Sequence, residues 1–243
     1  MVDYQAALVC ARLSQEVYRD FVSDIQFAAL PVAKVTLFES DDQGVTDTQV
    51  ALLYEPEISQ MHIIFRGSDK DIDWFNNFQL RQKIYPYGDD DSTNVRFHRG
   101  IMAAYFSVRD RLLAAVREVT VNRLIVTGHS LGGALSTVAA LDIQYNITQH
   151  TQQQLEAYSF GSPRVGNDAL TESFERRVPE NYRFVYGWDL VTQIPRIWQG
   201  YAHVEKEVRL GPWFTWNIFS RQLRDHEIIR YITALEEKVA NGG

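Results

Sequence analysis

The sequence predicts an α/β fold built on a mostly parallel β-sheet that helices cover on both faces. Short β-rich runs alternate with segments of helical length through most of the chain, after an early hairpin-like pair of runs. Strands joined through helices form right-handed crossovers and therefore parallel sheets. Neither a repeat nor a linker rich in Gly, Ser or Pro interrupts the 243 residues, so we expect one domain over residues 1–243.

The first part of the chain predicts one helix followed by an antiparallel edge. Apolar side chains recur at nearly helical spacing over residues 4–21, which indicates an amphipathic helix: Tyr4, Leu8, Ala11, Val17, Tyr18 and Phe21. Three β-rich runs follow at residues 32–38, 49–54 and 61–65. The tetrapeptide Asp41-Asp42-Gln43-Gly44 separates the first two runs, as a hairpin turn would.

The remainder of the chain alternates between the two kinds of element. We expect strands at residues 124–127, 155–160, 182–186 and 204–210, and helices at residues 101–119, 133–143, 168–178 and 227–239. The helices are long enough to return the chain to the same end of the sheet each time, which makes these strands parallel.

The composition is that of an ordinary globular protein, with 45% hydrophobic and 23% charged residues. This balance excludes collagen-like and disordered chains. The formal net charge of −7 gives no electrostatic reason to expect a nucleic-acid partner. No apolar run approaches the length of a transmembrane helix.

Cysteine usage and the amino terminus leave two compartments open. Cys10 is the only cysteine, so no intramolecular disulfide can form. The first residues lack the basic region of a signal peptide, and the short apolar stretch at residues 6–11 ends at Arg12. We expect a cytoplasmic protein or a secreted form with its leader removed.

The strongest chemical signal is Gly128-His129-Ser130-Leu131-Gly132-Gly133, placed between a predicted strand and a predicted helix. A sharp strand-to-helix turn lifts such a serine above the sheet, and glycines are needed where the turn leaves no room for Cβ atoms. The helix amino terminus adds a positive potential that favours a developing oxyanion. A glycine-rich turn with a capping serine is the alternative, and the strand and helix on either side favour Ser130 as nucleophile.

A serine nucleophile needs a base and an acid that orients the base. Asp189 is the predicted acid, because it follows the 182–186 strand at the carboxyl end of the sheet, where active-site loops gather. The alternative is a turn aspartate that binds its own backbone.

Two histidines follow Asp189, and we select His226 over His203 as the base. His203 precedes an alternating strand and is expected to point sideways from an edge. His226 follows Asp225, the predicted helix N-cap, and would therefore lie at the positive end of a helix dipole, which keeps an imidazole neutral. The other histidines are expected to be structural: His62, His98, His129 and His150.

An oxyanion hole requires at least two donors directed at one point. The backbone N–H of Leu131, directly after the nucleophile, is one candidate. The second is Ser68 in Phe65-Arg66-Gly67-Ser68, which follows an earlier strand and offers both an N–H and a hydroxyl.

These motifs together resemble the class 3 lipases, the triacylglycerol-lipase-like α/β hydrolases of filamentous fungi. In family order, the chain has Phe65-Arg66-Gly67-Ser68, Trp74, Phe97-His98-Arg99-Gly100-Ile101, the serine elbow, Phe160-Gly161-Ser162-Pro163-Arg164-Val165-Gly166-Asn167 and Asp225-His226. The resemblance spans residues 61 to 232. It implies an α/β-hydrolase fold, Ser130 as nucleophile, Asp189 as acid, His226 as base, and Ser68 with Leu131 as oxyanion donors.

The segment at residues 69–80 occupies the family's lid position. Its apolar residues fall three and four apart, which would give a short amphipathic helix over the pocket: Ile72, Trp74, Phe75 and Phe78. A surface helix that does not move is the alternative. Trp213 begins a second aromatic cluster that would line an acyl-chain site, contact lipid or simply pack in a loop.

We therefore expect a serine ester hydrolase, in first place a lipase that cleaves acylglycerols. A phospholipase or an esterase for aromatic esters on the same fold is one alternative, and a non-catalytic lipase-like binding module is another. No cofactor is expected, because phosphate-loop, dinucleotide and zinc spacings are absent from the sequence. Asp89-Asp90-Asp91 does not fit a calcium loop, so no metal is expected either.

Overall fold

The computed structural model describes residues 2–21, 25–40, 47–68, 81–85, 87, 94–204, 206–212 and 224–242. The predicted turn at residues 41–44 lies outside them.

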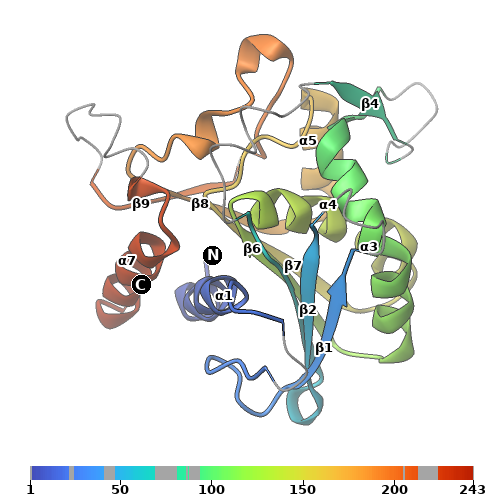
Figure 1. The fold of residues 1–243 in the computed structure, drawn as a ribbon, viewed down its shortest axis with the longest axis vertical. Helices are drawn as coiled ribbons and strands as arrows, with labels where there is room; N and C mark the ends of the chain where they lie inside the picture. The colour runs from blue at the N-terminus through green and yellow to red at the C-terminus, as the bar shows by residue number, and fades with distance from the viewer. Residues whose placement is uncertain are drawn as a thin grey trace.

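A seven-stranded sheet in the order β1-β2-β3-β6-β7-β8-β9 forms the centre of this part of the chain (Figure 1). The first three strands are antiparallel, and every later pair from β3 onward is parallel. Their bounds are β1 (Lys34–Glu39), β2 (Gln49–Glu55), β3 (Gln60–Phe65), β6 (Arg123–His129), β7 (Gln154–Phe160), β8 (Glu180–Tyr186) and β9 (Glu207–Leu210). The mostly parallel sheet with an antiparallel edge is confirmed.

Helices cover both faces of the sheet. α1 (Tyr4–Glu16) and α7 (Ile228–Ala240) lie together on one face, whereas α3 (Arg99–Glu118), α4 (Leu131–Asn146) and α5 (Asp168–Arg177) lie on the other (Figure 1). A hydrophobic core lies on each face of the sheet, and successive residues of a strand point into opposite cores. Leu124 and Val126 pack with α3 and α4, and Ile125 packs with α1 and α7. The central strands are covered by helices on both faces, so successive residues are all buried, and this is why their sequences are continuously aliphatic.

Several element boundaries differ from the sequence expectation. α1 ends at Glu16, before residue 21, and β9 begins at Glu207 rather than at residue 204. A small hairpin of β4 (Gln82–Ile84) and β5 (Arg96–His98) was not expected, since strands of three residues are too short to give a readable period. None of the described helices is both long and apolar enough to cross a lipid bilayer.

The parallel strands β3, β6 and β8 end on the same side of the sheet. Ser130 follows β6 directly, and Ser68 and Asp189 lie three residues after the ends of β3 and β8. Loops on that side form the ligand sites of parallel sheets.

Candidate active site

Ser130 occupies a sharp turn between β6 and α4. Its backbone has φ 57° and ψ −126°, a strained conformation for a residue with a side chain, and its N–H donates to the Phe160 carbonyl at 2.9 Å. A Cβ atom on Gly128 would lie 2.3 Å from the carbonyl oxygen of Gly132, and one on Gly132 would lie 2.2 Å from that of Phe65. The expected need for glycine at both positions is confirmed.

The structure brings Ser130, His226 and Asp189 into one hydrogen-bonded chain. Nε2 of His226 lies 2.9 Å from Oγ of Ser130, and its Nδ1 lies 2.8 Å and 3.0 Å from the two carboxylate oxygens of Asp189. A carboxylate only accepts hydrogen bonds, so Nδ1 carries the proton and Nε2 is left to accept from the serine hydroxyl. All three side chains are buried.

Tyr231, on α7, is a third partner of the Asp189 carboxylate. Its hydroxyl donates to Oδ2 at 2.5 Å, while the Val191 N–H donates to Oδ1 at 2.9 Å. Burial, followed by the nearby Asp189 charge, raises the pKa of Tyr231 well above its usual value, so the phenol remains a donor. The sequence does not reveal this role, because an aromatic residue on the apolar face of a predicted helix is expected only to pack in the hydrophobic core.

His129 and Tyr18 hold the loop that carries His226. Nε2 of His129 lies 2.7 Å from the backbone carbonyl of His226, and Nδ1 lies 2.9 Å from the Tyr18 hydroxyl. Since a carbonyl accepts only, Nε2–H donates to it and Nδ1 accepts from Tyr18. The rings of His129 and His226 are 4.6 Å apart. His129 is structural, as expected, but it acts directly on the base.

Asp225 does not cap α7, so that expectation is wrong. The N-cap is Glu227, which makes no side-chain capping bond, and Oδ2 of Asp225 instead accepts from the Trp188 N–H at 3.0 Å. The carboxylate therefore ties the His226 loop to the Asp189 loop, a contact across 37 positions that no local pattern reveals.

Gly161 has φ +58° and lies directly against the acid–base pair. A Cβ atom there would be 2.7 Å from Oδ2 of Asp189 and 2.9 Å from Nδ1 of His226. Only glycine combines this backbone conformation with so close an approach. Gly161 belongs to the Phe160–Asn167 stretch that resembles the family motif, which was the one sequence signal for it.

The two oxyanion candidates lie beside the serine turn. Leu131 is the first residue of α4, immediately after Ser130. Ser68 follows Gly67, whose Cβ position would be 2.7 Å from the His129 carbonyl and 2.1 Å from the Tyr18 hydroxyl. The chain at Gly67 is thus pressed against the serine turn, which brings the end of β3 next to the nucleophile.

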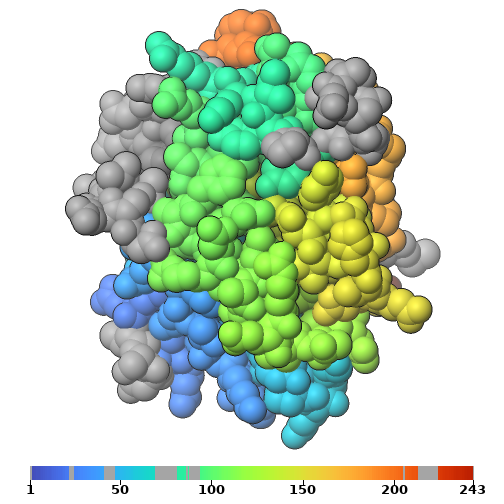
Figure 2. Space-filling view, turned by 90° about the vertical axis from the view of Figure 1, so that its right-hand side faces the viewer, coloured from blue at the N-terminus to red at the C-terminus, as the bar shows by residue number. Residues whose placement is uncertain are grey.

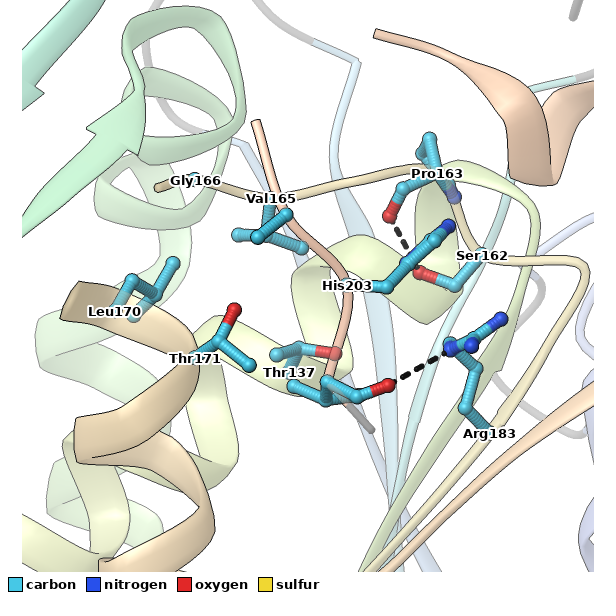
Figure 3. A pocket seen from close by; sticks show the side chains of 11 residues that line it. Thr137, Ser162, Pro163, Val165, Gly166, Leu170, Thr171, Arg183 and His203 are labelled. Atoms are coloured by element: carbon cyan, nitrogen blue, oxygen red, sulfur yellow. Dashed lines mark hydrogen bonds between the residues drawn. The ribbon is translucent and has the colours of Figure 1, made fainter. Parts of the chain in front are cut away.

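His203 is turned away from this chain of hydrogen bonds. Its Nε2–H donates to the Thr192 carbonyl at 2.6 Å, and it lines a cavity of about 10 Å³ together with Thr137, Ser162 and Arg183 (Figure 3). Burial and then the Arg183 charge lower the pKa of His203 well below its usual value. The expectation that it points sideways from an edge strand is wrong, and the cavity is too small for an organic ligand.

The expected lid and aromatic residues fall outside the described part of the chain: Ile72, Trp74, Phe75, Phe78 and Trp213. Within the described residues, no group of His, Cys, Asp or Glu side chains is arranged to hold a metal ion.

A mostly parallel sheet, covered on both faces and carrying a serine turn at the end of a central strand, defines the α/β-hydrolase fold. Comparison with known proteins narrows this class. The model of the family described as Lipase (class 3) matches residues 62–198, more than half of the chain. The chain belongs to the class 3 lipase family.

Three curated relatives illustrate the range of that family. Secreted mono- and diacylglycerol lipase 1 of Fusarium solani is 35% identical over 153 residues, which are 60% of this chain and 43% of that protein. Secreted mono- and diacylglycerol lipase A of Penicillium cyclopium is 28% identical over 70% of this chain and 54% of its own. Phospholipase A1-II 5 of Oryza sativa is also 28% identical, over 62% of this chain and 38% of its own.

The chain therefore spans about half the length of the two fungal relatives. Among solved structures, the lipase of Rhizopus microsporus var. chinensis superposes with a TM-score of 0.74 over 96% of this chain and 85% of its own. The sequence identity of that pair is 22%, so the likeness shows a common fold.

Proposed function

We propose that this protein is a serine ester hydrolase that cleaves acylglycerols through an acyl-enzyme. The observation that carries the proposal is the continuous chain from Ser130 through His226 to Asp189, with contacts of 2.9 Å and 2.8 Å. A hydroxyl is a weak nucleophile until an adjacent base takes its proton, and the imidazole here is already in contact.

The reaction begins when Oγ of Ser130 attacks the ester carbonyl while Nε2 of His226 takes the hydroxyl proton. Asp189 holds the imidazole in the required tautomer and stabilises the imidazolium that forms. The N–H groups of Leu131 and Ser68 would hold the developing oxyanion at the amino terminus of α4. His226 then protonates the departing alcohol, and a water molecule activated by the same imidazole releases the acid.

Access to the serine requires a second state of the molecule. Ser130 and Asp189 are fully buried, and His226 is nearly so. An ester cannot reach Oγ unless covering residues move, and movement of a covering segment is a common step in enzymes whose sites exclude water.

The family relatives favour acylglycerols as the substrate class. The Fusarium and Penicillium proteins are named as secreted mono- and diacylglycerol lipases. Their names also favour a secreted form over a cytoplasmic one. The Oryza relative is named a phospholipase, which makes phospholipid esters the second candidate. Hydrolysis rates on diacylglycerol and phosphatidylcholine in the same detergent micelles would separate the two.

Replacement of the nucleophile and the base tests the proposal. Wild-type protein should react with a fluorophosphonate probe and hydrolyse p-nitrophenyl esters, and Ser130→Ala should do neither. His226→Ala should lose about 10²–10⁴-fold in kcat, because the general base is gone. His203→Ala is the matched control and should retain most of the activity, since its Nε2 is committed to Thr192. Equal losses in the two histidine variants would contradict the assignment.

A further inference from the structure

The loop between β8 and β9 carries an exposed apolar tip. Ile197 and Trp198, in the 3₁₀ turn η4 (Ile197–Gln199), are 70% and 80% exposed. Figures 1 and 2 show this orange segment projecting at the top of the molecule, and Figure 2 shows teal residues of the β4–β5 region below it. We call residues 196–199 the Trp198 tip.

Hydrogen bonds to neighbouring elements hold the Trp198 tip in place. Arg164 donates from its N–H to the Ile194 carbonyl at 2.9 Å and from Nη1 to the Pro195 carbonyl at 2.8 Å. On the other side, Nε2 of Gln82 donates to the Gly200 carbonyl at 2.8 Å. A loop ordered in this way loses little conformational entropy when its side chains bind a surface.

The tip and the segment that contacts its loop carry basic side chains, although the whole chain is acidic. Within the described parts of segments 81–100 and 194–202 there are exposed cations and no acidic residue: Arg81, Lys83, Arg96, Arg99 and Arg196. The Arg196 guanidinium lies 5.6 Å from the centre of the Trp198 ring, and Gln82, between two of the cations, contacts the tip loop directly. Asp89, Asp90 and Asp91 lie outside the described residues.

The tip also lies on the same side of the sheet as the serine. Its loop begins after Tyr186 at the carboxyl end of β8 and includes Asp189, and β6 has its carboxyl end on the same side, directly before Ser130. Anything that binds the tip would therefore lie on the side of the molecule that carries the nucleophile.

We propose that the Trp198 tip inserts into the surface of a lipid aggregate whose anionic headgroups bind the exposed cations of the tip and of segment 81–100. This inference rests on the proposed function, because a lipid surface is where acylglycerol substrates occur. Trp is enriched at membrane–water interfaces, and Lys and Arg beside an apolar group favour anionic lipids. A folded protein partner fits less well, since a stable interface needs roughly 800 Å² per side and the apolar part here is two side chains.

Vesicle binding by a catalytically inactive protein tests this proposal without hydrolysis of the lipid. Ser130→Ala should sediment with vesicles of phosphatidylcholine mixed with phosphatidylglycerol, and less with phosphatidylcholine alone. Adding Trp198→Ala should weaken binding to the anionic vesicles at least about tenfold, through the loss of buried apolar surface. Adding Lys83→Gln should weaken it about fivefold, as expected for one basic residue near the surface.

Ile58→Ser provides the matched control. Ile58 is 59% exposed in the turn before β3, at the end of the parallel strands opposite to the one from which the tip loop leaves. This variant should bind vesicles as Ser130→Ala alone does. Thermal unfolding should be nearly unchanged by Trp198→Ala, because the side chain is exposed.

The outcomes separate the two proposals. If wild type hydrolyses soluble esters but Trp198→Ala and Ile58→Ser bind vesicles alike, the surface proposal is overturned and the proposed function stands. Binding that is equal on the two kinds of vesicle would overturn the role of the cations. Tip-dependent binding by a protein that hydrolyses no ester would support the surface and reject the enzyme.

Discussion

At the scale of single residues, the site depends on side chains that contact the base without taking part in the chemistry. His129 links the Tyr18 hydroxyl to the backbone of His226, and Tyr231 occupies the acid oxygen that Nδ1 of His226 approaches most closely. Two residues therefore fix the position of the His226 imidazole: His129 through the backbone carbonyl of His226, and Tyr231 through the Asp189 carboxylate. Displacement of a reacting group by an ångström can cost about a hundredfold in rate.

We predict that His129→Phe lowers kcat on a soluble ester about tenfold and leaves KM unchanged, since it releases the His226 carbonyl without touching substrate. His129→Gln should restore most of kcat, because its amide N–H reaches toward the same carbonyl. Steady-state kinetics on a p-nitrophenyl ester would measure both parameters. A parallel rise in KM, or no rescue by glutamine, would show that His129 acts only through packing.

At the scale of the element, the turn after β7 permits the acid–base contact. We predict that Gly161→Ala lowers kcat more than tenfold, because its Cβ would meet Asp189 at 2.7 Å and His226 at 2.9 Å. The φ of +58° adds backbone strain of about 1 kcal/mol.

Gly200→Ala separates the two effects. It has φ +79° and so carries similar backbone strain, but its Cβ would find only Gln82 Nε2, at 3.9 Å. Gly200→Ala should lose only the free energy of unfolding that backbone strain costs, about 1 kcal/mol in urea, and should keep its activity toward a soluble ester. Gly161→Ala should lose at least that much stability, because its Cβ also clashes with two buried side chains, and should lose activity as well. Equal activities in the two variants would show that the close approach at Gly161 is not needed to position Asp189 and His226.

Elements with long apolar patterns could be predicted from the sequence, and elements fixed by tertiary contacts could not. The buried strands β3, β6 and β7 and the helix α4 follow from continuous or periodic hydrophobicity. Asp225 was misplaced as a cap because its partner is a backbone N–H in another loop. The serine turn was predictable because glycines, a strand and a helix adjoin it in sequence. Tyr18 lies in the turn after α1 and Tyr231 on the buried face of α7, and the sequence predicts only core packing for aromatic residues at such places.

At the scale of the whole molecule, the buried histidines predict how stability changes with pH. Burial, then the Arg123 charge, lowers the pKa of His62 to about 3, and burial lowers the pKa of His98 to about 3. Glu55 lies 3.5 Å from Nδ1 of His62, too far for a short ion pair, so we take burial as the dominant effect. Both rings therefore stay neutral in the folded protein. In the unfolded chain the same two histidines take up protons once the pH falls below their usual pKa of 6.5.

Because the unfolded state then binds more protons, stability falls as the pH decreases from about 6.5 toward 3, by about 1.4 kcal/mol per pH unit for each of these histidines. We predict that His62→Gln, although less stable than wild type at pH 8, shows a shallower loss of unfolding free energy between pH 6 and 4 by that amount per unit. Urea unfolding at a series of pH values measures the slope of unfolding free energy against pH for wild type and for the variant. The contributions of carboxylates that the two proteins share cancel in the difference between the slopes. Identical slopes would mean that His62 is protonated in the folded protein and has Glu55 as an ion-pair partner after all.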